Sequence, residues 1–228
     1  FLMDRFGYAK TVDVSAYERN KEAADAENRY VLTCKNTDKI CIFTNTGQMH
    51  LLKVLDLPFG KFRDKGTPID NLSNYDSKTE NFIYIINLGA ISSRKVIFGT
   101  KNAMLKVVDG SEFDVAKRTT AATKLNDGDE LLFVRVLEET ADPEAADRTE
   151  TLIMQSEKDF FLRIEVSTIP EKKKGAVGVR GMKLGIGDVL TAIYLLKDDE
   201  AVSVEVKGKE VALNRLRTAG RDTKGTKR

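Results

Sequence analysis

The clearest strand signal in this chain is the stretch ICIFTNTGQMHLLKVLDLP, residues 40–58. It opens with an apolar run rich in β-branched residues, turns at Gly47 and continues as a second apolar run that ends at Pro58. β-branched residues favour strands, and a glycine tolerates the positive φ that a tight hairpin turn needs. The stretch therefore predicts a β-hairpin.

Degenerate copies of this hairpin pattern recur along the chain. They predict turns at Gly, Asn or Asp residues, which tolerate φ > 0. Strand-built repeats spaced by roughly 40–50 residues are typical of propeller-like blades. The further copies lie at residues 1–17, 95–113, 151–170 and 201–220, and the five predicted turn residues are Gly7, Gly47, Asn102, Asp159 and Gly208.

A second element follows most of the hairpins. It reads as a basic residue, a small residue, an apolar run, an acidic turn and another apolar run, with strong turn signals at residues 126–129 and 185–188. After the fifth copy the element stops at residues 221–228, so we expect the last blade to be incomplete or closed by strands from elsewhere. Residues 1–228 are thus predicted to form one all-β, propeller-like disc of about five four-stranded blades. The element occurs at residues 65–88, 118–137 and 178–196.

Helical periodicity is scarce. We expect a short helix within residues 15–28, where Ala and Glu are dense, and an exposed loop over residues 138–149. No apolar run approaches the ~20 residues of a membrane span, and the start does not resemble a signal peptide. The chain begins without an initiator Met, so we expect it to be part of a longer protein. Cys34 and Cys41 are too few to staple this domain and are interpreted as small hydrophobic residues in or near strands, which fits a reducing cytoplasm.

No catalytic constellation is evident in the residue pattern. His50 is the single histidine and is interpreted as structural, because a base or metal ligand needs partners. Gly185 and Gly187 form half of a dinucleotide fingerprint, but strands flank them and Asp188 follows. Acidic pairs at residues 127/129 and 198/199 fall in predicted turns, where solvated acids are commonest. We therefore predict no catalytic residue, no cofactor and no metal in this chain.

The basic residues are more informative by position than by number. With 37 basic and 35 acidic residues the net charge is only +2, which alone is a weak case for nucleic-acid binding. Equivalent positions of successive blades fall on one ring, and a ring of cations suits a phosphate backbone. The alternative, ordinary solvated charges balanced by the acids, stays open. The candidate DNA-binding residues are Arg5, the post-turn residues Lys10, Lys53, Lys106, Arg163 and Arg215, and the loop residues Lys61, Arg63, Lys65, Lys117, Arg118, Lys172, Lys173, Lys174, Arg180, Arg221 and Lys224.

Three segments resemble a known family. RFGYAKTVDVSAY (residues 5–17), residues 40–58 followed by FRDKGTPIDNL, and VGVRGMKLGIGDVLTAIYLL (residues 177–196) are similar to the blade motifs of the C-terminal domains of bacterial type IIA DNA topoisomerase A subunits. The resemblance implies a β-pinwheel, in which neighbouring blades exchange strands and a basic outer rim bends double-stranded DNA. It places the catalytic tyrosine in a cleavage core outside this chain, so Tyr8 and Tyr17 are interpreted as strand and rim residues.

The resemblance also sets expectations for partners and for the type of enzyme. The implied partners are the cleavage core and the B subunit that carries the ATPase, with ATP and Mg²⁺ bound elsewhere in the enzyme, in a cytoplasmic, nucleoid-associated setting. DNA gyrase carries a Gly- and basic-rich box after its first blade motif, whereas residues 18–30 here are acid-rich and lack glycine. That difference and the five copies favour topoisomerase IV, which relaxes and decatenates DNA. A wrapping domain of the DNA gyrase A subunit and a propeller-type protein-interaction module remain the alternatives.

Overall fold

The strands form five antiparallel sheets, called blades 1 to 5 in chain order. A computed structural model describes residues 1–138, 150–197 and 200–228. Blades 1 to 4 have four strands each and blade 5 has two. The strands of each blade are given from the inner to the outer edge. Blade 1 is β3 (Asn28–Val31), β1 (Leu2–Asp4), β2 (Tyr8–Lys10) and β6 (Thr67–Pro68), and blade 2 is β7 (Phe82–Asn87), β4 (Lys39–Thr44), β5 (Gln48–Lys53) and β10 (Thr119–Ala121). Blade 3 is β11 (Leu131–Val136), β8 (Lys95–Thr100), β9 (Met104–Asp109) and β14 (Val179–Arg180), blade 4 is β15 (Leu190–Leu196), β12 (Thr151–Ser156), β13 (Phe160–Glu165) and β18 (Thr226–Lys227), and blade 5 is β16 (Ser203–Val206) and β17 (Lys209–Ala212).

Neighbouring blades exchange strands. The outer strand of each of the first four blades comes from the repeat that follows, so β6 leaves the β4–β5 repeat to pair with β2, and β10 leaves the β8–β9 repeat to pair with β5. β14 and β18 pair with β9 and β13 in the same way. The predicted all-β pinwheel is confirmed.

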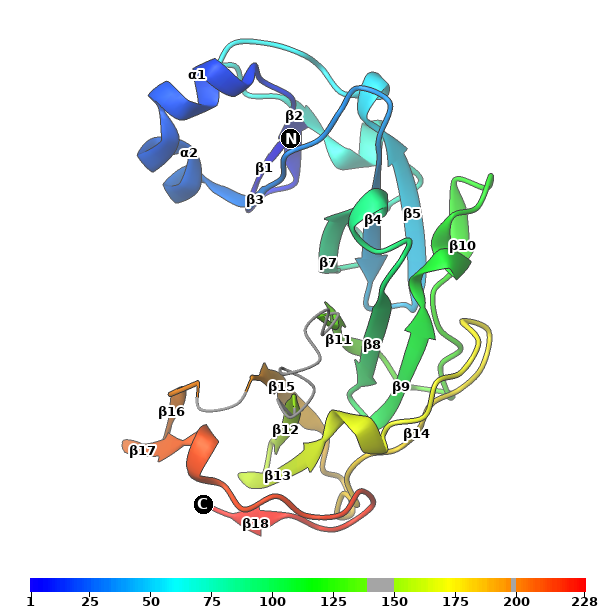
Figure 1. Cartoon of the computed structure of the whole chain (residues 1–228), viewed down its shortest axis with the longest axis vertical. Coiled ribbons are helices and arrows are strands. Elements are labelled where there is room, and N and C mark those ends of the chain that lie inside the picture. Colours follow the sequence, from blue (N-terminus) through cyan, green and yellow to red (C-terminus); the bar gives the residue numbers. More distant parts are fainter. Residues whose placement is uncertain (139–149, 198–199) are drawn as a thin grey trace, which may run out of the picture.

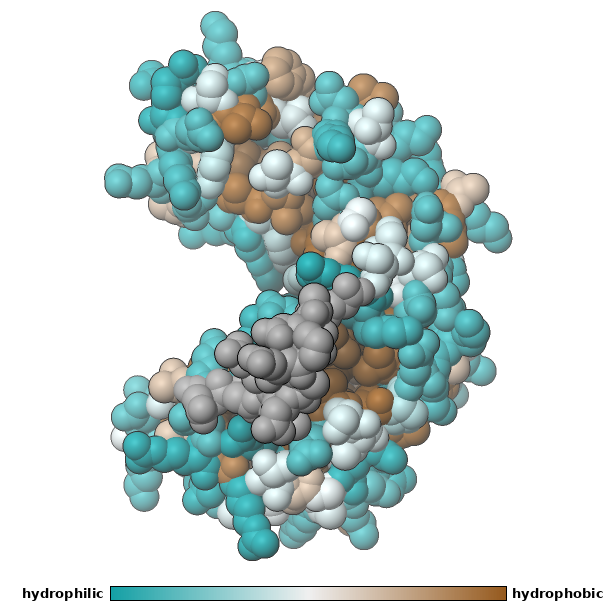
Figure 2. All heavy atoms as spheres, viewed as in Figure 1, coloured by the Kyte–Doolittle hydropathy of each residue, from teal (hydrophilic) through white to brown (hydrophobic). Residues whose placement is uncertain are grey.

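The blades follow one another around an open crescent (Figure 1), with the N-terminus in blade 1 and the C-terminus beside β18 in blade 4, toward its opposite tips. Figure 2 shows the hollow between the two tips on the concave side. Blade 5 contributes only the hairpin β16–β17 among the described residues, which agrees with the expectation of an incomplete last blade.

The hairpin turns use the left-handed backbone conformation at one position in each of the first four blades. Gly7, Gly47 and Asp159 occupy it with φ of 84°, 76° and 64°. In blade 3 the residue is Ala103, with φ of 60°, and not its neighbour Asn102 as predicted. Asn102 instead donates its backbone N–H to Asp129 Oδ1 at 2.9 Å, so the turn is held from outside the hairpin. The turn preferences of the residues in the hairpin do not reveal this support from another segment.

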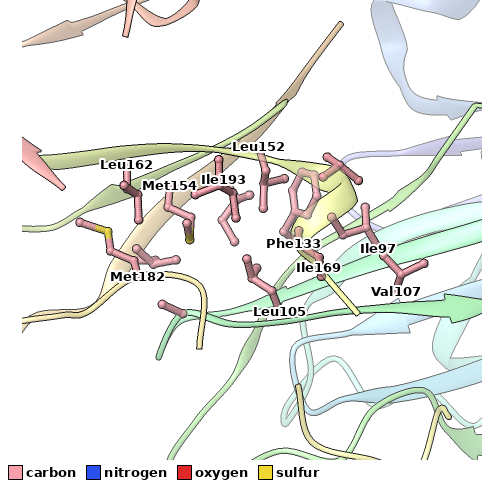
Figure 3. Packing of buried hydrophobic residues seen from close by; sticks show 14 residues of the cluster. Ile97, Leu105, Val107, Phe133, Leu152, Met154, Leu162, Ile169, Met182 and Ile193 are labelled. Atoms are coloured by element: carbon pink, nitrogen blue, oxygen red, sulfur yellow. The ribbon is translucent and has the colours of Figure 1, made fainter. Parts of the chain in front are cut away.

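The hydrophobic core is divided into clusters that lie between adjacent blades. Figure 3 shows one of them, where Leu105 and Phe133 of blade 3 face Leu152 and Ile193 of blade 4. Three further clusters join the remaining neighbouring blades. Burial of these apolar side chains is the main favourable term in packing the crescent, so each blade is stabilised chiefly by its neighbours.

In the part of the chain that the structure describes, helical structure is confined to short segments. The helix expected within residues 15–28 is confirmed as two helices, α1 (Val14–Arg19) and α2 (Lys21–Glu27), with Asp13 accepting the Ser15 N–H as the N-cap of α1. Most of the loop expected at 138–149 lies outside the described residues, as do the acidic residues 198/199. In the described residues no helix is long and apolar enough to cross a membrane. Short 3₁₀ turns are η1 (Val54–Asp56), η2 (Ile69–Asn71), η3 (Leu88–Ala90), η4 (Gly110–Phe113), η6 (Val166–Thr168) and η7 (Leu213–Arg215).

Candidate nucleic-acid interface

Four loops carry the chain from one repeat to the outer edge of the preceding blade. We call residues 58–66, 114–118, 170–178 and 217–225 the crossing loops; each follows a 3₁₀ turn and leads to an outer strand. Three of them also form a parallel bridge to the blade that they reach. The outer strands β10, β14 and β18 lie along the convex side of the crescent (Figure 1). The crossing loops therefore occupy equivalent places on this outer side.

Three crossing loops end in a glycine that lies against the receiving strand. A Cβ at this position would approach a backbone carbonyl oxygen to less than 3 Å, which real Cβ atoms essentially never show. Glycine is therefore required sterically, and the basic residue before it in two of these loops is fixed in place. The distance from such a Cβ to the oxygen would be 2.7 Å for Gly66 to Ala9, 2.5 Å for Gly178 to Leu105 and 2.6 Å for Gly225 to Phe161.

The basic residues immediately before two of these glycines stack on aromatic rings. Lys65 Nζ lies 4.2 Å from the Tyr8 ring centroid, and Lys224 Nζ lies 5.0 Å from that of Phe160. A cation over a ring is held by the ring quadrupole while its N–H groups stay open to solvent. Arg118 takes the equivalent place in the third repeat and is exposed. The exposed loop candidates are Lys61, Arg63, Lys65, Lys117, Arg118, Lys173 and Lys224, and the half-buried ones are Lys172, Lys174 and Arg221.

Three post-turn residues use their cationic groups to bind backbone carbonyl oxygens of the next repeat. Lys106 is 1% exposed, and its ammonium donates to the carbonyl oxygens of Lys174 at 2.7 Å and Ala176 at 2.8 Å. Lys10 donates to carbonyl oxygens of loop 58–66. Arg163 donates to the carbonyl oxygen of Asn214 at 2.6 Å. The expectation that these residues line the exposed ring is therefore corrected: Lys10 and Lys106 hold crossing loops in place, Arg163 binds the turn η7, and Lys106 is not accessible to a phosphate.

Burial lowers the pKa of Lys106 to about 8. The cause is loss of hydration, which disfavours the charged form, although nearby Glu112 opposes the shift. The three carbonyl acceptors give the ammonium the hydrogen bonds that it loses to burial. Lys106 is therefore a structural lysine.

Blade 2 has a histidine where blades 1 and 3 have Lys10 and Lys106. His50 is buried, with Nε2 2.8 Å from Glu80 Oε2 and Nδ1 3.0 Å from Thr119 Oγ1 on β10. The structural interpretation of His50 is confirmed, since it ties the exchanged strand to its blade. Lys53 lies at the exposed end of β5 and is not equivalent to the other post-turn residues.

Acidic neighbours offset part of the positive charge on the middle loops. Arg118 Nη2 lies 3.9 Å from Asp56, Lys173 Nζ lies 3.4 Å from Glu112, and Arg180 Nη1 lies 3.3 Å from Asp222. The Arg118–Asp56 and Arg180–Asp222 pairs are exposed, and such pairs contribute at most about 1 kcal/mol, so a phosphate can replace the carboxylate at little cost.

The remaining candidates lie outside the crossing loops. Arg5 is exposed at the tip of the β1–β2 hairpin, and Arg180 and Arg215 are exposed on β14 and η7. The sequence-based set omits several exposed cations of the last repeat, including Arg217 and Lys227. Arg217 begins the fourth crossing loop and Lys227 ends β18, so including every cation of these two segments would have found them.

The chain is similar in sequence to known proteins. Residues 94–138 and 150–206 match a family described as the DNA gyrase C-terminal domain, beta-propeller. The DNA gyrase A subunit of Lawsonia intracellularis is 26% identical over 98% of this chain and 28% of its own length. The corresponding protein of Helicobacter pylori strain 26695 is 27% identical, over 96% and 27%. The chain thus spans about a quarter of the length of these relatives.

Solved structures share the fold. The C-terminal domain of DNA topoisomerase IV superposes with a TM-score of 0.84 at 22% identity, over 99% of this chain and 70% of that one. The E. coli ParC C-terminal domain gives 0.76 at 15% identity, over 100% and 92%. The DNA gyrase A C-terminal domain gives 0.60 at 19% identity, over 85% and 60%.

Proposed function

We propose that this chain, which belongs to the family of DNA gyrase C-terminal domains, binds double-stranded DNA along its convex side. The binding is independent of sequence, and it bends the DNA that the rest of the enzyme acts on. The observation that carries this proposal is the recurrence of exposed lysine and arginine residues on successive crossing loops.

The chemistry of the crossing loops suits phosphate groups. Most of their cations are exposed, and the loops that carry them come at equivalent places of successive blades. Phosphate contacts supply most of non-specific DNA affinity through counterion release, and they carry no base information. A curved array of such contacts stabilises bent DNA over straight DNA.

The larger role follows from the relatives and is part of the proposal. The domain would present a DNA segment to the cleavage core of an ATP-dependent type II topoisomerase, which also contains the ATPase-bearing B subunit and acts in the cytoplasm. Residues 18–30 support modest bending of the topoisomerase IV type. They comprise the end of α1, all of α2 and the start of β3, and the four acids Glu18, Glu22, Asp25 and Glu27 are all exposed.

Full wrapping of DNA, as in a gyrase, is the second candidate function. It is favoured by the matched relatives, which are gyrase A subunits. A short duplex with a fluorophore at each end distinguishes the two, because energy transfer reports how far the ends approach. We expect a moderate rise in energy transfer when the duplex binds. A near-complete approach of the duplex ends, together with negative supercoiling of DNA by the full enzyme, would favour the gyrase role.

Gel retardation at low salt tests DNA binding itself. Alanine at Arg63, Lys65 and Arg118 should weaken the binding of several unrelated duplexes equally, because these residues contact the backbone. A matched variant with alanine at Lys21, Lys35 and Lys78, three exposed lysines away from the crossing loops, should bind normally. Absence of retardation in the unmodified chain, or equal effects of the two variants, contradicts the proposal.

A further inference from the structure

A polar cavity lies between the tip of the β1–β2 hairpin and blade 2. Its volume is about 220 Å³, which suits a small ion or a single phosphate group. Two arginines line it, and Asp70 is the one acid among the described lining residues. The lining consists of Arg5, Phe6, Gly7, Arg29, Asp70, Tyr75, Ser77, Asn81 and Phe82.

The two arginines are available to a ligand. Arg5 lies over the Phe6 ring at 4.8 Å and Arg29 over the Tyr30 ring at 5.4 Å. Within residues 1–138, 150–197 and 200–228 neither guanidinium forms an ion pair or a hydrogen bond. A guanidinium stacked on a ring keeps the N–H groups at its edge free for an anion. The cavity therefore holds two open arginines.

The single acid of the cavity does not neutralise both arginines. Asp70 Oδ1 accepts the backbone N–H of Ser77 at 2.6 Å, which directs this carboxylate to its own loop. Among the charged residues that line the cavity, two arginines stand against one carboxylate. The side chains of Ser77 and Asn81, two further lining residues, form no hydrogen bond to other described residues, so their hydroxyl and amide groups are free to bind a ligand.

The cavity lies at the junction of blades 1 and 2, and the junction of blades 2 and 3 shows which side chains occupy the equivalent position there. There, Glu130 directly precedes β11, and its carboxylate accepts from Asn45 at 2.9 Å and from Lys101 at 2.9 Å. Asn81 holds the same position before β7, and Arg5 holds that of Asn45 before the hairpin turn. The first junction thus has cations but lacks the carboxylate that pairs with a cation in the second.

We propose that this cavity binds a phosphate group through Arg5 and Arg29. The forked N–H groups of arginine match phosphate oxygens in pairs, and the Asn81 amide adds a donor where Glu130 supplies a carboxylate in the next junction. The group comes either from the DNA backbone or from a free phosphate compound. The site lies at a hairpin tip and not on a crossing loop, so it goes beyond the proposed rim.

Titration with inorganic phosphate in the absence of DNA tests this site directly. The arginine side-chain N–H resonances of the chain are followed by NMR, and saturable shifts of those of Arg5 and Arg29 are expected. Asn81→Glu should abolish the shifts, because it restores an internal carboxylate, and Arg29→Ala should weaken binding at least tenfold. Arg19→Ala, an exposed control on α1, should bind as the unmodified chain does. Absence of saturable shifts, or normal binding by folded Asn81→Glu, overturns the proposal.

DNA affinity of Asn81→Glu then identifies the source of the phosphate. A several-fold loss of DNA affinity indicates that a backbone phosphate occupies the cavity, whereas unchanged DNA affinity together with abolished phosphate binding indicates a free phosphate compound. Because the titration contains no DNA, its failure is distinct from failure of DNA binding at the rim.

Discussion

Lys106 donates to the backbone carbonyl oxygen of Lys174 at 2.7 Å. One lysine of the repeat thus lies buried beneath a loop and holds in place another lysine that lies above it. The same arrangement recurs in blade 1, where Lys10 supports the loop that presents Lys65. The basic residues of the repeat therefore have two roles: some are covered by a crossing loop and stabilise it, and others lie on that loop at the surface.

Lys106→Met should destabilise the domain by about 1–3 kcal/mol, the usual cost of leaving buried polar groups unsatisfied. The substitution keeps the apolar stem but leaves the carbonyl oxygens of crossing loop 170–178 without their donor. Urea denaturation measures the loss. Lys173→Ala, which removes an exposed side chain, should change stability by less than about 1 kcal/mol. Equal stability of the Met variant and the unmodified chain would show that the contact is not structural.

Stability should rise with pH on the alkaline side because of the same lysine. Its folded pKa is about 8, below the value of ~10.4 for a free lysine, so the unfolded chain binds more protons between these values. The free energy of unfolding therefore increases from about pH 8 to about pH 10. Denaturation across this range should show a steeper rise for the unmodified chain than for Lys106→Met. Parallel pH profiles would contradict the shift.

Gly225→Ala should loosen strand β18 from blade 4. The residue has φ of 74°, and a Cβ would lie 2.6 Å from the Phe161 carbonyl oxygen. The backbone conformation alone costs about 1–2 kcal/mol for a residue with a side chain, and the close approach adds to it. Gly220→Ala is the control, since a Cβ there meets nothing within 4 Å. Hydrogen exchange of β18 amides should rise in the first variant only; equal protection in both would contradict the steric explanation.

Acidification should weaken the blade 2 junction through Glu80. Burial by itself raises the pKa of Glu80, but hydrogen bonds from Thr46 and Thr44 and the charge of His50 outweigh it and hold the pKa below its usual range. The contribution is therefore present above the unfolded pKa, near pH 4.5, and is lost as the pH falls through the lower folded value. Between about pH 6 and about pH 3, the free energy of unfolding of Glu80→Gln should fall by less than that of the unmodified chain. A loss as large as that of the unmodified chain would exclude Glu80 as the cause.

The hairpins and their arrangement could be predicted from local chemistry. β-branched runs and turn residues mark each hairpin, and the spacing of the repeats indicates blades. Whether a post-turn residue faces solvent could not be predicted, because that depends on strand exchange. A loop from the next repeat covers Lys106, and no property of the segment around Lys106 reveals that cover. The turn at Ala103 was missed for a related reason, since Asp129 supports it from outside.

The dependence of DNA affinity on salt is the sharpest test of DNA binding by the crossing loops. The logarithm of the binding constant is plotted against that of the salt concentration for the unmodified chain, for Arg63→Ala/Lys65→Ala/Arg118→Ala and for Lys21→Ala/Lys35→Ala/Lys78→Ala. We predict a steep negative slope that becomes shallower by about 0.9 for each phosphate contact removed, in the crossing-loop variant only. No binding at low salt, or the same slope in all three proteins, would contradict DNA binding by the crossing loops.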